Sequence, residues 1–229
     1  MVKKQVKSKE RVSEHGEVYT AEREVNNMLD LVKSESERID SRFLEPACGD
    51  GNFLSVILQR KLDTVRKKYR RNLADYEKYA ILALSSLYGV DILEDNISEC
   101  RDRLGKIWLK NYKSCARKNA DPILSKCIAY ILSHNILCGN ALTMLTNDNR
   151  PIIFSQWDFT SGFNIKRKDY RLDELVSGGN NNEQMRMFED ENNLMATKWE
   201  YDKELDTLMP NPIREYPPMD YLTIAEVEE

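Results

Sequence analysis

A glycine turn between an apolar segment and a helical pattern constrains the fold of this chain more than any other feature. Residues 42–47 (RFLEPA) have the composition of a short buried strand, and Cys48-Gly49-Asp50-Gly51 follows directly. From Asn52 onward, apolar residues recur at helical spacing. Glycine permits the positive φ or close approach that such a turn needs. The turn exposes N–H groups at a helix start beside the carboxyl end of a strand, where open α/β sheets bind ligands.

The rest of the chain up to residue 172 alternates between strand-like and helix-like patterns. Strands are predicted at 88–92, 136–138 and 151–157, with a return strand at 163–172. Helices are predicted at 20–33 with Thr20 as N-cap, from Asn52 onward, at 94–110 and at 122–132. Strands that alternate with helices favour a parallel sheet with crossover helices.

Two common nucleotide sites do not fit the glycine turn. A dinucleotide site has a third glycine where this chain has Leu54, and an acid about 20 residues further on. Here the next acid at a strand end, Asp91, comes 40 residues after Gly51. A phosphate-binding loop of the Walker type is also absent, since no Lys-Ser or Lys-Thr follows a glycine turn.

The glycine turn and three other segments resemble one enzyme family. Residues 44–54 (LEPACGDGNFL) are similar to the S-adenosylmethionine-binding motif of adenine-specific DNA methyltransferases from restriction-modification systems. Three further family motifs have counterparts in the expected order, at 15–20 (HGEVYT), 89–92 (GVDI) and 139–142 (GNAL). The resemblance covers roughly residues 11–145. It implies an α/β, Rossmann-like methyltransferase fold with a parallel central sheet and flanking helices.

The resemblance also implies a site for S-adenosyl-L-methionine. In that site Asp91 would accept hydrogen bonds from the ribose hydroxyls, and Ile92 would pack on the adenine. The Thr20 hydroxyl would reach the methionine carboxylate, and Glu45 would lie near the ammonium group. The full set of implied cofactor-binding residues is Thr20, Glu45, Ala47, Cys48, Gly49, Gly51, Phe53, Asp91, Ile92 and Asn140.

Two of the motifs depart from the family pattern, and single residues have simpler interpretations. Ala21 replaces a proline, and Asn140 replaces an acid but keeps an oxygen that can accept a hydrogen bond. Taken alone, Thr20 and Glu45 could be helix caps, and Asp91 could be a solvated strand end. The ordered set of motifs favours the cofactor site.

The catalytic motif of the family, Asn/Asp/Ser-Pro-Pro-aromatic, is missing at its expected place. That place is occupied by residues 152–159 (IIFSQWDF), and the chain's Pro-Pro lies far away at 217–218. Ser155, Gln156 and Trp157 lie at the position of the family's catalytic motif and could imitate its contacts with a flipped adenine. No catalytic residue is assigned.

Charge divides the chain into two parts. Residues 172–229 carry 4 basic and 15 acidic side chains, a net of −11, so the net of −4 leaves +7 for residues 1–171. We expect a methyltransferase-like domain over 1–176 and an acidic, largely irregular or disordered tail over 177–229, where Pro210, Pro212, Pro217 and Pro218 oppose regular structure. The tail would act as a solvating segment or as a docking strip for a basic partner.

Cysteine and histidine usage indicates a reduced, cytoplasmic protein without a metal site. The five cysteines form no CxxC pair, and there are two histidines, which disfavours zinc. No apolar stretch reaches the 18 or more residues of a membrane helix, so no membrane partner is expected.

The sequence leaves three functions open. The first is an adenine methyltransferase acting on DNA, or its cofactor-binding subunit, in which a second restriction-modification polypeptide supplies target recognition and the missing motif. The second is a non-catalytic module that binds S-adenosylmethionine or serves assembly. The third is methylation of RNA or protein by a related fold, because fold does not fix substrate.

Overall fold

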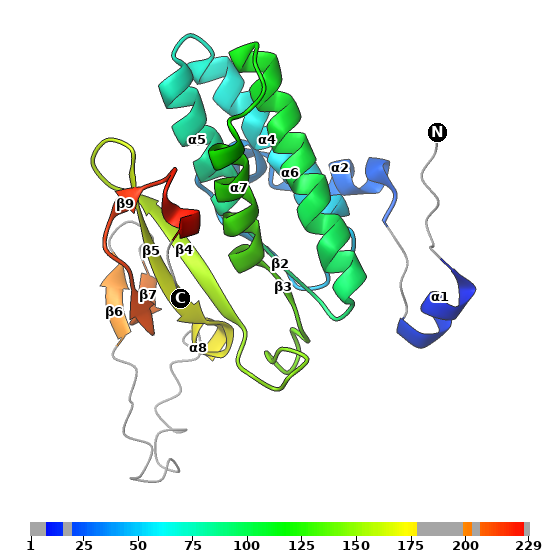
Figure 1. The fold of residues 1–229 in the computed structure, drawn as a ribbon. Helices are drawn as coiled ribbons and strands as arrows, with labels where there is room; N and C mark the ends of the chain where they lie inside the picture. Colours follow the sequence, from blue (N-terminus) through cyan, green and yellow to red (C-terminus); the bar gives the residue numbers. More distant parts are fainter. Residues whose placement is uncertain (1–7, 16–19, 178–198, 203–206, 227–229) are drawn as a thin grey trace.

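The structure is a computed structural model that describes residues 8–15, 20–177, 199–202 and 207–226. Its centre is a parallel sheet of β1 (Phe43–Glu45), β2 (Leu87–Asp91) and β3 (Ile136–Cys138), in the order β1-β2-β3. Leu44 pairs with Tyr88, and Val90 pairs with Leu137. The α/β class, the parallel sheet and the flanking helices predicted from the sequence are confirmed (Figure 1).

Helices connect and flank these strands. They are α1 (Lys9–His15), α2 (Glu22–Leu31), α3 (Lys33–Glu37), α4 (Asn52–Tyr69), α5 (Leu73–Ser85), α6 (Glu94–Ala116) and α7 (Pro122–Asn135). Side-chain caps set two of their starts: Asn72 accepts from the Ala74 and Asp75 N–H groups, and Asp121 caps α7 ahead of Pro122. The helix predicted over 20–33 is shorter and breaks at Val32, where the backbone leaves the helical region. Its N-cap is Ala21, so Thr20 is not the cap.

Successive residues of a strand point to opposite sides of the sheet, and different elements cover the two faces. On one face Gly89 lies against Cys48 and Leu54, so α4 packs closely there. The larger core cluster is built from this face and from the helices α4 to α7, including Leu58, Ile81 and Trp108. On the other face the Tyr88 ring meets Phe154 edge-on, with ring centroids 5.3 Å apart.

A hairpin covers this second face. Strand β4 (Ile153–Phe159) pairs antiparallel with β5 (Asn164–Arg171), from Ile153↔Arg171 to Phe159↔Ile165. Ile152, Phe154 and Leu172 form a second core cluster with Val90. The return strand is therefore confirmed, but β4 does not extend the parallel sheet as expected. Residues 139–152 form turns and isolated bridges instead of a crossover helix, and a chain without that helix reverses onto the face of the sheet.

The acidic C-terminal segment is more regular than its composition predicted. After α8 (Leu172–Ser177), β6 (Trp199–Asp202) pairs with β7 (Thr207–Pro210), while β8 (Arg214–Glu215) and β9 (Met219–Asp220) both pair with β5. The short helix η2 (Ile224–Glu226) packs against α7.

Tyr221 and Ile224, from this same segment, are buried in the larger core. Residues 207–226 therefore contain short paired strands and a buried 3-10 turn joined by irregular backbone, and the prediction of a largely irregular tail is not tested over the remaining residues. Pro212, Pro217 and Pro218 fall between the short strands, where no ladder N–H is lost. The division of the chain at residues 176 and 177 stays a prediction, since 178–198 lie outside the described residues.

The described residues contain neither a membrane-spanning helix nor a cluster of metal ligands. None of the helices described is both long enough and apolar enough to cross a membrane. No group of three or more His, Cys, Asp or Glu side chains in the described ranges is placed to hold a metal ion.

Candidate functional site

The glycine turn lies at the carboxyl end of β1, as the sequence predicted. Gly49 and Gly51 have φ values of 52° and 85°, which glycine adopts readily. The Cys48 N–H donates to the Val90 carbonyl at 2.9 Å, and the Gly51 N–H donates to the Cys48 carbonyl at 2.9 Å. A Cβ on Gly51 would lie 2.7 Å from the Cys100 sulfur. Gly51 is thus required both by its conformation and by the close approach of α6.

The turn leads directly into α4, which begins at Asn52 as predicted. Its N-cap is Gly51, which has no side chain to accept from the first-turn N–H groups. The first turn of α4 contains no acidic residue either. The positive end of an 18-residue helix therefore faces the turn without an anion supplied by its own cap or first turn.

Asp91 joins the ends of all three parallel strands. Its Oδ2 accepts from the Gly49 N–H at 3.0 Å, and its Oδ1 accepts from the Leu93 N–H at 2.9 Å. Asn96 donates its Nδ2 to the same Oδ1 at 3.2 Å, and the Gly139 N–H donates to the Asp91 backbone carbonyl at 2.9 Å. The half-buried Asp91 carboxylate therefore fixes the glycine turn against the end of β2.

An ion pair between the half-buried Arg103 and the buried Asp50 supports the turn from the side of α6. Arg103 donates to both carboxylate oxygens of Asp50, at 3.2 and 3.1 Å, and to the Asn52 Oδ1 at 2.8 Å. The Asp50 side chain is 6% exposed. Asn52 in turn donates its Nδ2 to the Thr20 carbonyl at 3.3 Å, which places Thr20 beside the start of α4.

The resemblance included Asn96 and Cys100, but neither they nor Arg103 were assigned a supporting role at the turn, although a signal for that role was present. Asn96, Cys100 and Arg103 stand at positions i, i+4 and i+7 of α6, so they lie on one face of that helix. Asn96 contacts Asp91, Cys100 contacts Gly51, and Arg103 contacts Asp50. Polar or small residues at this spacing, in a helix that follows a strand ending in an acid, indicate that this face of the helix packs against the turn.

The predicted residues differ in how accessible they are. Ala47 and Asn140 are exposed, Ile92 is 45% exposed, and Phe53 is half-buried. Glu45 is half-buried, and burial raises its pKa while a contact with the Ala47 N–H opposes that rise.

Cys48 is buried in the turn and does not have the properties of a nucleophile. Contact with the Cys100 thiol and burial both raise the pKa of the Cys48 thiol. A thiol is reactive as its thiolate, so Cys48 is a packing residue at neutral pH.

Asn140 is placed near the end of β3 but already uses its side-chain oxygen. The Asn140 Oδ1 accepts from the Leu142 N–H at 2.9 Å and from the Thr143 N–H at 3.4 Å. This is the local turn that Asn commonly forms. Residues 16–19 of the motif before Thr20 lie outside the described residues.

The residues at the expected position of the catalytic motif belong to the hairpin, away from the glycine turn. Ser155 is 1% exposed and donates to the Asp169 Oδ1 at 2.7 Å. Gln156 donates to both Asp158 oxygens, and Trp157 donates its Nε1 to the Asn135 Oδ1 at 3.0 Å. Each side chain is committed to a structural hydrogen bond, so the possibility that these three imitate the catalytic motif is not supported.

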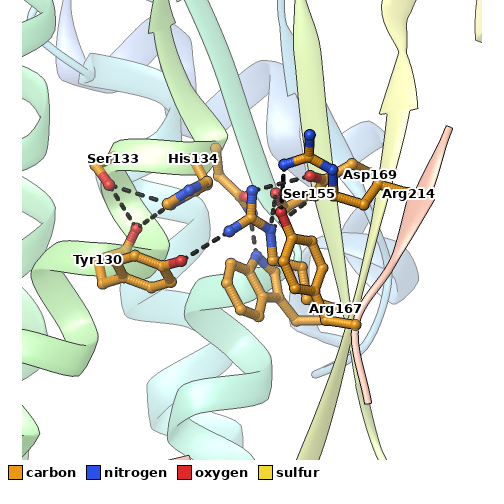
Figure 2. Close-up of polar contacts among 10 residues, drawn as sticks. Tyr130, Ser133, His134, Ser155, Arg167, Asp169 and Arg214 are labelled. Atoms are coloured by element: carbon orange, nitrogen blue, oxygen red, sulfur yellow. Dashed lines mark hydrogen bonds and ion pairs between the residues drawn. The ribbon is translucent and has the colours of Figure 1, made fainter. Parts of the chain in front are cut away.

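The centre of the hairpin is Arg167, which is 8% exposed. It donates to the two Asp169 oxygens at 2.8 and 2.9 Å, to Ser155 Oγ at 3.0 Å and to the Tyr130 hydroxyl at 2.7 Å (Figure 2). Its guanidinium also lies 4.5 Å from the Tyr216 ring centroid. The cavity beside it has a volume of about 10 Å³, room for about one water molecule and too little for a base.

Comparison with known proteins gives one limited likeness. A curated relative from Methanocaldococcus jannaschii, named "Putative type II restriction enzyme and methyltransferase", is 29% identical to this chain over 111 residues. The match takes in 47% of this chain and 9% of the relative, so the chain spans less than a tenth of that relative's length. No protein-family model matches the sequence. No solved structure matches it either.

Proposed function

We propose that this chain is the S-adenosylmethionine-binding part of a DNA adenine methyltransferase from a restriction-modification system. The observation that carries the proposal is the hydrogen bond from the Gly49 N–H to Asp91, which holds a strand-end acid against the glycine turn. The uncapped start of α4 lies at the same point. The name of the curated relative combines restriction and methyltransferase functions, which supports the choice of system.

The residues around the turn fit the parts of this cofactor. The N–H groups at the start of α4 suit the methionine carboxylate, and Thr20, whose backbone carbonyl accepts from Asn52 Nδ2, lies beside the helix start. The half-buried Glu45 suits the ammonium group, and the exposed Ile92 offers an apolar surface to the adenine. When bound, the cofactor supplies a methyl group from its sulfonium.

Asp91 and Asn140 limit the fit, because both already accept hydrogen bonds from the protein. Asp91 Oδ2 accepts from the Gly49 N–H, and a carboxylate oxygen has a second lone-pair site for a ribose hydroxyl. Asn140 accepts from two N–H groups through one oxygen, so its turn must open before it receives an adenine amino group. Asp91 is therefore proposed as the stronger of the two contacts.

The transfer itself is proposed to need a second polypeptide. The catalytic motif has no counterpart at its expected place in the sequence, and Ser155, Gln156 and Trp157 hold the hairpin together. A partner that brings the Pro-Pro motif and recognises the DNA sequence would complete the enzyme. The role of this chain is to bind and orient the methyl donor.

Calorimetric titration of S-adenosylmethionine into the full chain tests the cofactor site. The wild-type chain should bind, and Asp91→Asn should weaken binding at least about tenfold, because the amide loses acceptor capacity toward both Gly49 and the ribose. Asp102→Asn is the matched control, since Asp102 is 72% exposed and pairs with Lys106 on the outer surface of α6. Equal affinity of the three proteins, or no binding by wild type, would overturn the site. Circular dichroism of each variant checks that the fold is intact.

The non-catalytic module remains the second candidate, favoured by the engagement of Ser155, Gln156 and Trp157 within the hairpin. Transfer of labelled methyl groups to DNA separates the two. The enzyme hypothesis predicts transfer by the chain together with the proteins encoded beside it. The module hypothesis predicts that the chain binds cofactor or a partner, but that no methyl group is transferred to DNA, with or without the neighbouring proteins.

A further inference from the structure

The ends of α4 and α6 carry a concentration of positive charge that the cofactor site does not use. Eight basic residues lie in the last turns of these two helices and in the residues that follow them, and we refer to them as the basic end. They are Arg66, Lys67, Lys68, Arg70, Arg71, Lys113, Arg117 and Lys118. All eight are exposed.

Two segments distant in sequence meet to form the basic end. Both α4 and α6 begin at the carboxyl edge of the parallel sheet and run away from it, so their last turns lie together at the far end of the helices (Figure 1). The Arg66 guanidinium lies close enough to Cys115, in the last turn of α6, to affect the pKa of its thiol. Burial raises the pKa of that thiol, and the guanidinium opposes the rise. The two cationic clusters therefore form one surface.

Few carboxylates offset this charge. Asp63 pairs with Arg66 at 2.6 Å, Asp75 accepts from Asn72 at 2.7 Å, and Asp121 caps α7. Within the described part of the chain, no carboxylate forms an ion pair with the other seven cations. The negative ends of the α4 and α6 dipoles favour cations at this place, but they do not require so many.

A pair of tyrosines lies within the basic end. The rings of Tyr69, at the end of α4, and Tyr79, on α5, stack with centroids 4.0 Å apart and an angle of 8° between them. Both side chains are half-buried. Aromatic rings beside cations are what proteins offer to nucleic acid, where bases or sugars contact the rings and the cations neutralise phosphates.

We propose that the basic end binds the phosphate backbone of nucleic acid. Four of its eight cations are arginines, whose planar guanidinium groups match phosphate oxygens in pairs. The surface lies away from the glycine turn by the length of α4, about 27 Å for its 18 residues. It therefore anchors the nucleic acid and does not present a base to the methyl donor. The inference rests on the proposed function, which names DNA as the partner and is the reason for using DNA as the probe.

Fluorescence anisotropy with a labelled DNA duplex of about 30 base pairs, without cofactor and over a salt series, tests the proposal. The test variant carries Lys67→Glu, Lys68→Glu, Arg70→Glu and Arg71→Glu. The matched control carries Arg23→Glu, Lys33→Glu, Lys106→Glu and Arg150→Glu, four residues with side chains 64–85% exposed on other surfaces. Both variants have the same net charge, so a difference in their affinity for DNA is due to where the substitutions lie on the surface.

Wild type should bind the duplex and lose affinity as salt rises, because counterions are released from the phosphates. The test variant should bind at least about tenfold more weakly with a shallower salt dependence, and the control should remain within about twofold of wild type. The milder variant with alanine at the same four test positions should fall between wild type and the glutamate variant, which guards against a misfolded test protein.

Three results would overturn the proposal: no binding by wild type at low salt, equal loss in test and control variants, or displacement of the duplex by polyglutamate as efficiently as by unlabelled DNA. The last result would assign the surface to acidic proteins. Because the assay contains no S-adenosylmethionine, a chain that binds DNA through the basic end but fails the calorimetric test would reject the cofactor site alone.

Discussion

The glycine turn at the edge of the parallel sheet and the β4–β5 hairpin on one of its faces are held together in different ways. At the turn, backbone N–H groups bond to Asp91 and to the Val90 carbonyl, and two glycines adopt positive φ. In the hairpin, the buried Arg167 is surrounded by Asp169, Ser155 and aromatic rings. The turn therefore depends on conformation and close approach, while the hairpin depends on one desolvated charge that must stay paired.

The largest expected effect comes from breaking the charge pair in the hairpin. Asp169→Ala should lower the free energy of unfolding by about 3–5 kcal/mol, because it leaves the buried Arg167 without its carboxylate. Urea unfolding monitored by circular dichroism measures the loss. Glu215→Ala is the control, since its ion pair with Lys166 is partly exposed and should contribute less than about 1 kcal/mol. Similar losses in both variants would show that the hairpin does not depend on its buried charge pair.

The next effect tests the close approach at the turn. Gly51→Ala should cost about 2–3 kcal/mol, because alanine is strained at a φ of 85° and its Cβ would meet the Cys100 sulfur at 2.7 Å. Gly162→Ala provides the comparison: its φ is 67°, and its Cβ would have no neighbour within 4 Å. It should cost about 1 kcal/mol from conformation alone. Chemical unfolding of the double variant Gly51→Ala, Cys100→Ala should recover part of the difference, and no recovery would show that packing on Cys100 is unimportant.

A pH-dependent effect is expected on the helix side of the sheet, at the buried Lys61 of α4. Its ammonium donates to the Ile39 and Ser41 carbonyls and to Ser86 Oγ, and burial lowers its pKa to about 7. The unfolded chain, with an ordinary lysine pKa of 10.5, binds more protons between these two values. The contribution of Lys61 to stability is therefore fully present above about pH 10.5 and is lost as the pH falls toward 7.

Unfolding curves of wild type and Lys61→Met, recorded at intervals between about pH 7 and 9, isolate this contribution. The stability of wild type relative to the variant should rise by about 1 kcal/mol per pH unit. A difference that does not change with pH would show that Lys61 keeps an ordinary pKa. The comparison within one pH series removes the effects of the tyrosines and cysteines, which both proteins share.

The smallest expected effect is at Asn140, where the turn after β3 is held by one side chain. Asn140→Ala removes the acceptor of the Leu142 and Thr143 N–H groups and should cost less than about 1 kcal/mol, because the site is exposed. Calorimetry then shows whether S-adenosylmethionine binding changes. A larger loss of affinity than Asp91→Asn causes would reverse the order of the two contacts proposed above.

Local signals made the turn predictable to the residue. Glycines at 49 and 51 and the apolar spacing after Asn52 define the strand-to-helix connection, and the structure begins α4 at Asn52. The third strand was predicted at the bounds that the structure gives, Ile136–Cys138. The side chains that support the turn were not predicted, since Arg103 pairs with Asp50 across 53 residues and only the spacing on α6 points to them.

The placement of the hairpin and the folding of the C-terminal segment could not be derived in the same way. The pattern predicted the return strand, but strand periodicity does not state which surface a hairpin covers. Strands β8 and β9 have two residues each, so they owe their existence to pairing with β5 and not to their own propensity. Composition emphasised the acids and prolines of this segment and missed Tyr221 and Ile224, two apolar contacts that anchor it.

The Tyr221 hydroxyl donates to Glu77 at 2.7 Å, and the two residues are 144 positions apart in the chain. That contact can form only after almost all of the described chain has been synthesised. Until then Ile165 and Trp157, which share the core with Tyr221, lack part of their cover. Contacts of such long range slow folding and prolong the life of species with exposed apolar surface. The order of synthesis thus leaves the glycine turn and its helices free to assemble early, whereas the cover that Tyr221 gives to the hairpin residues can form only late.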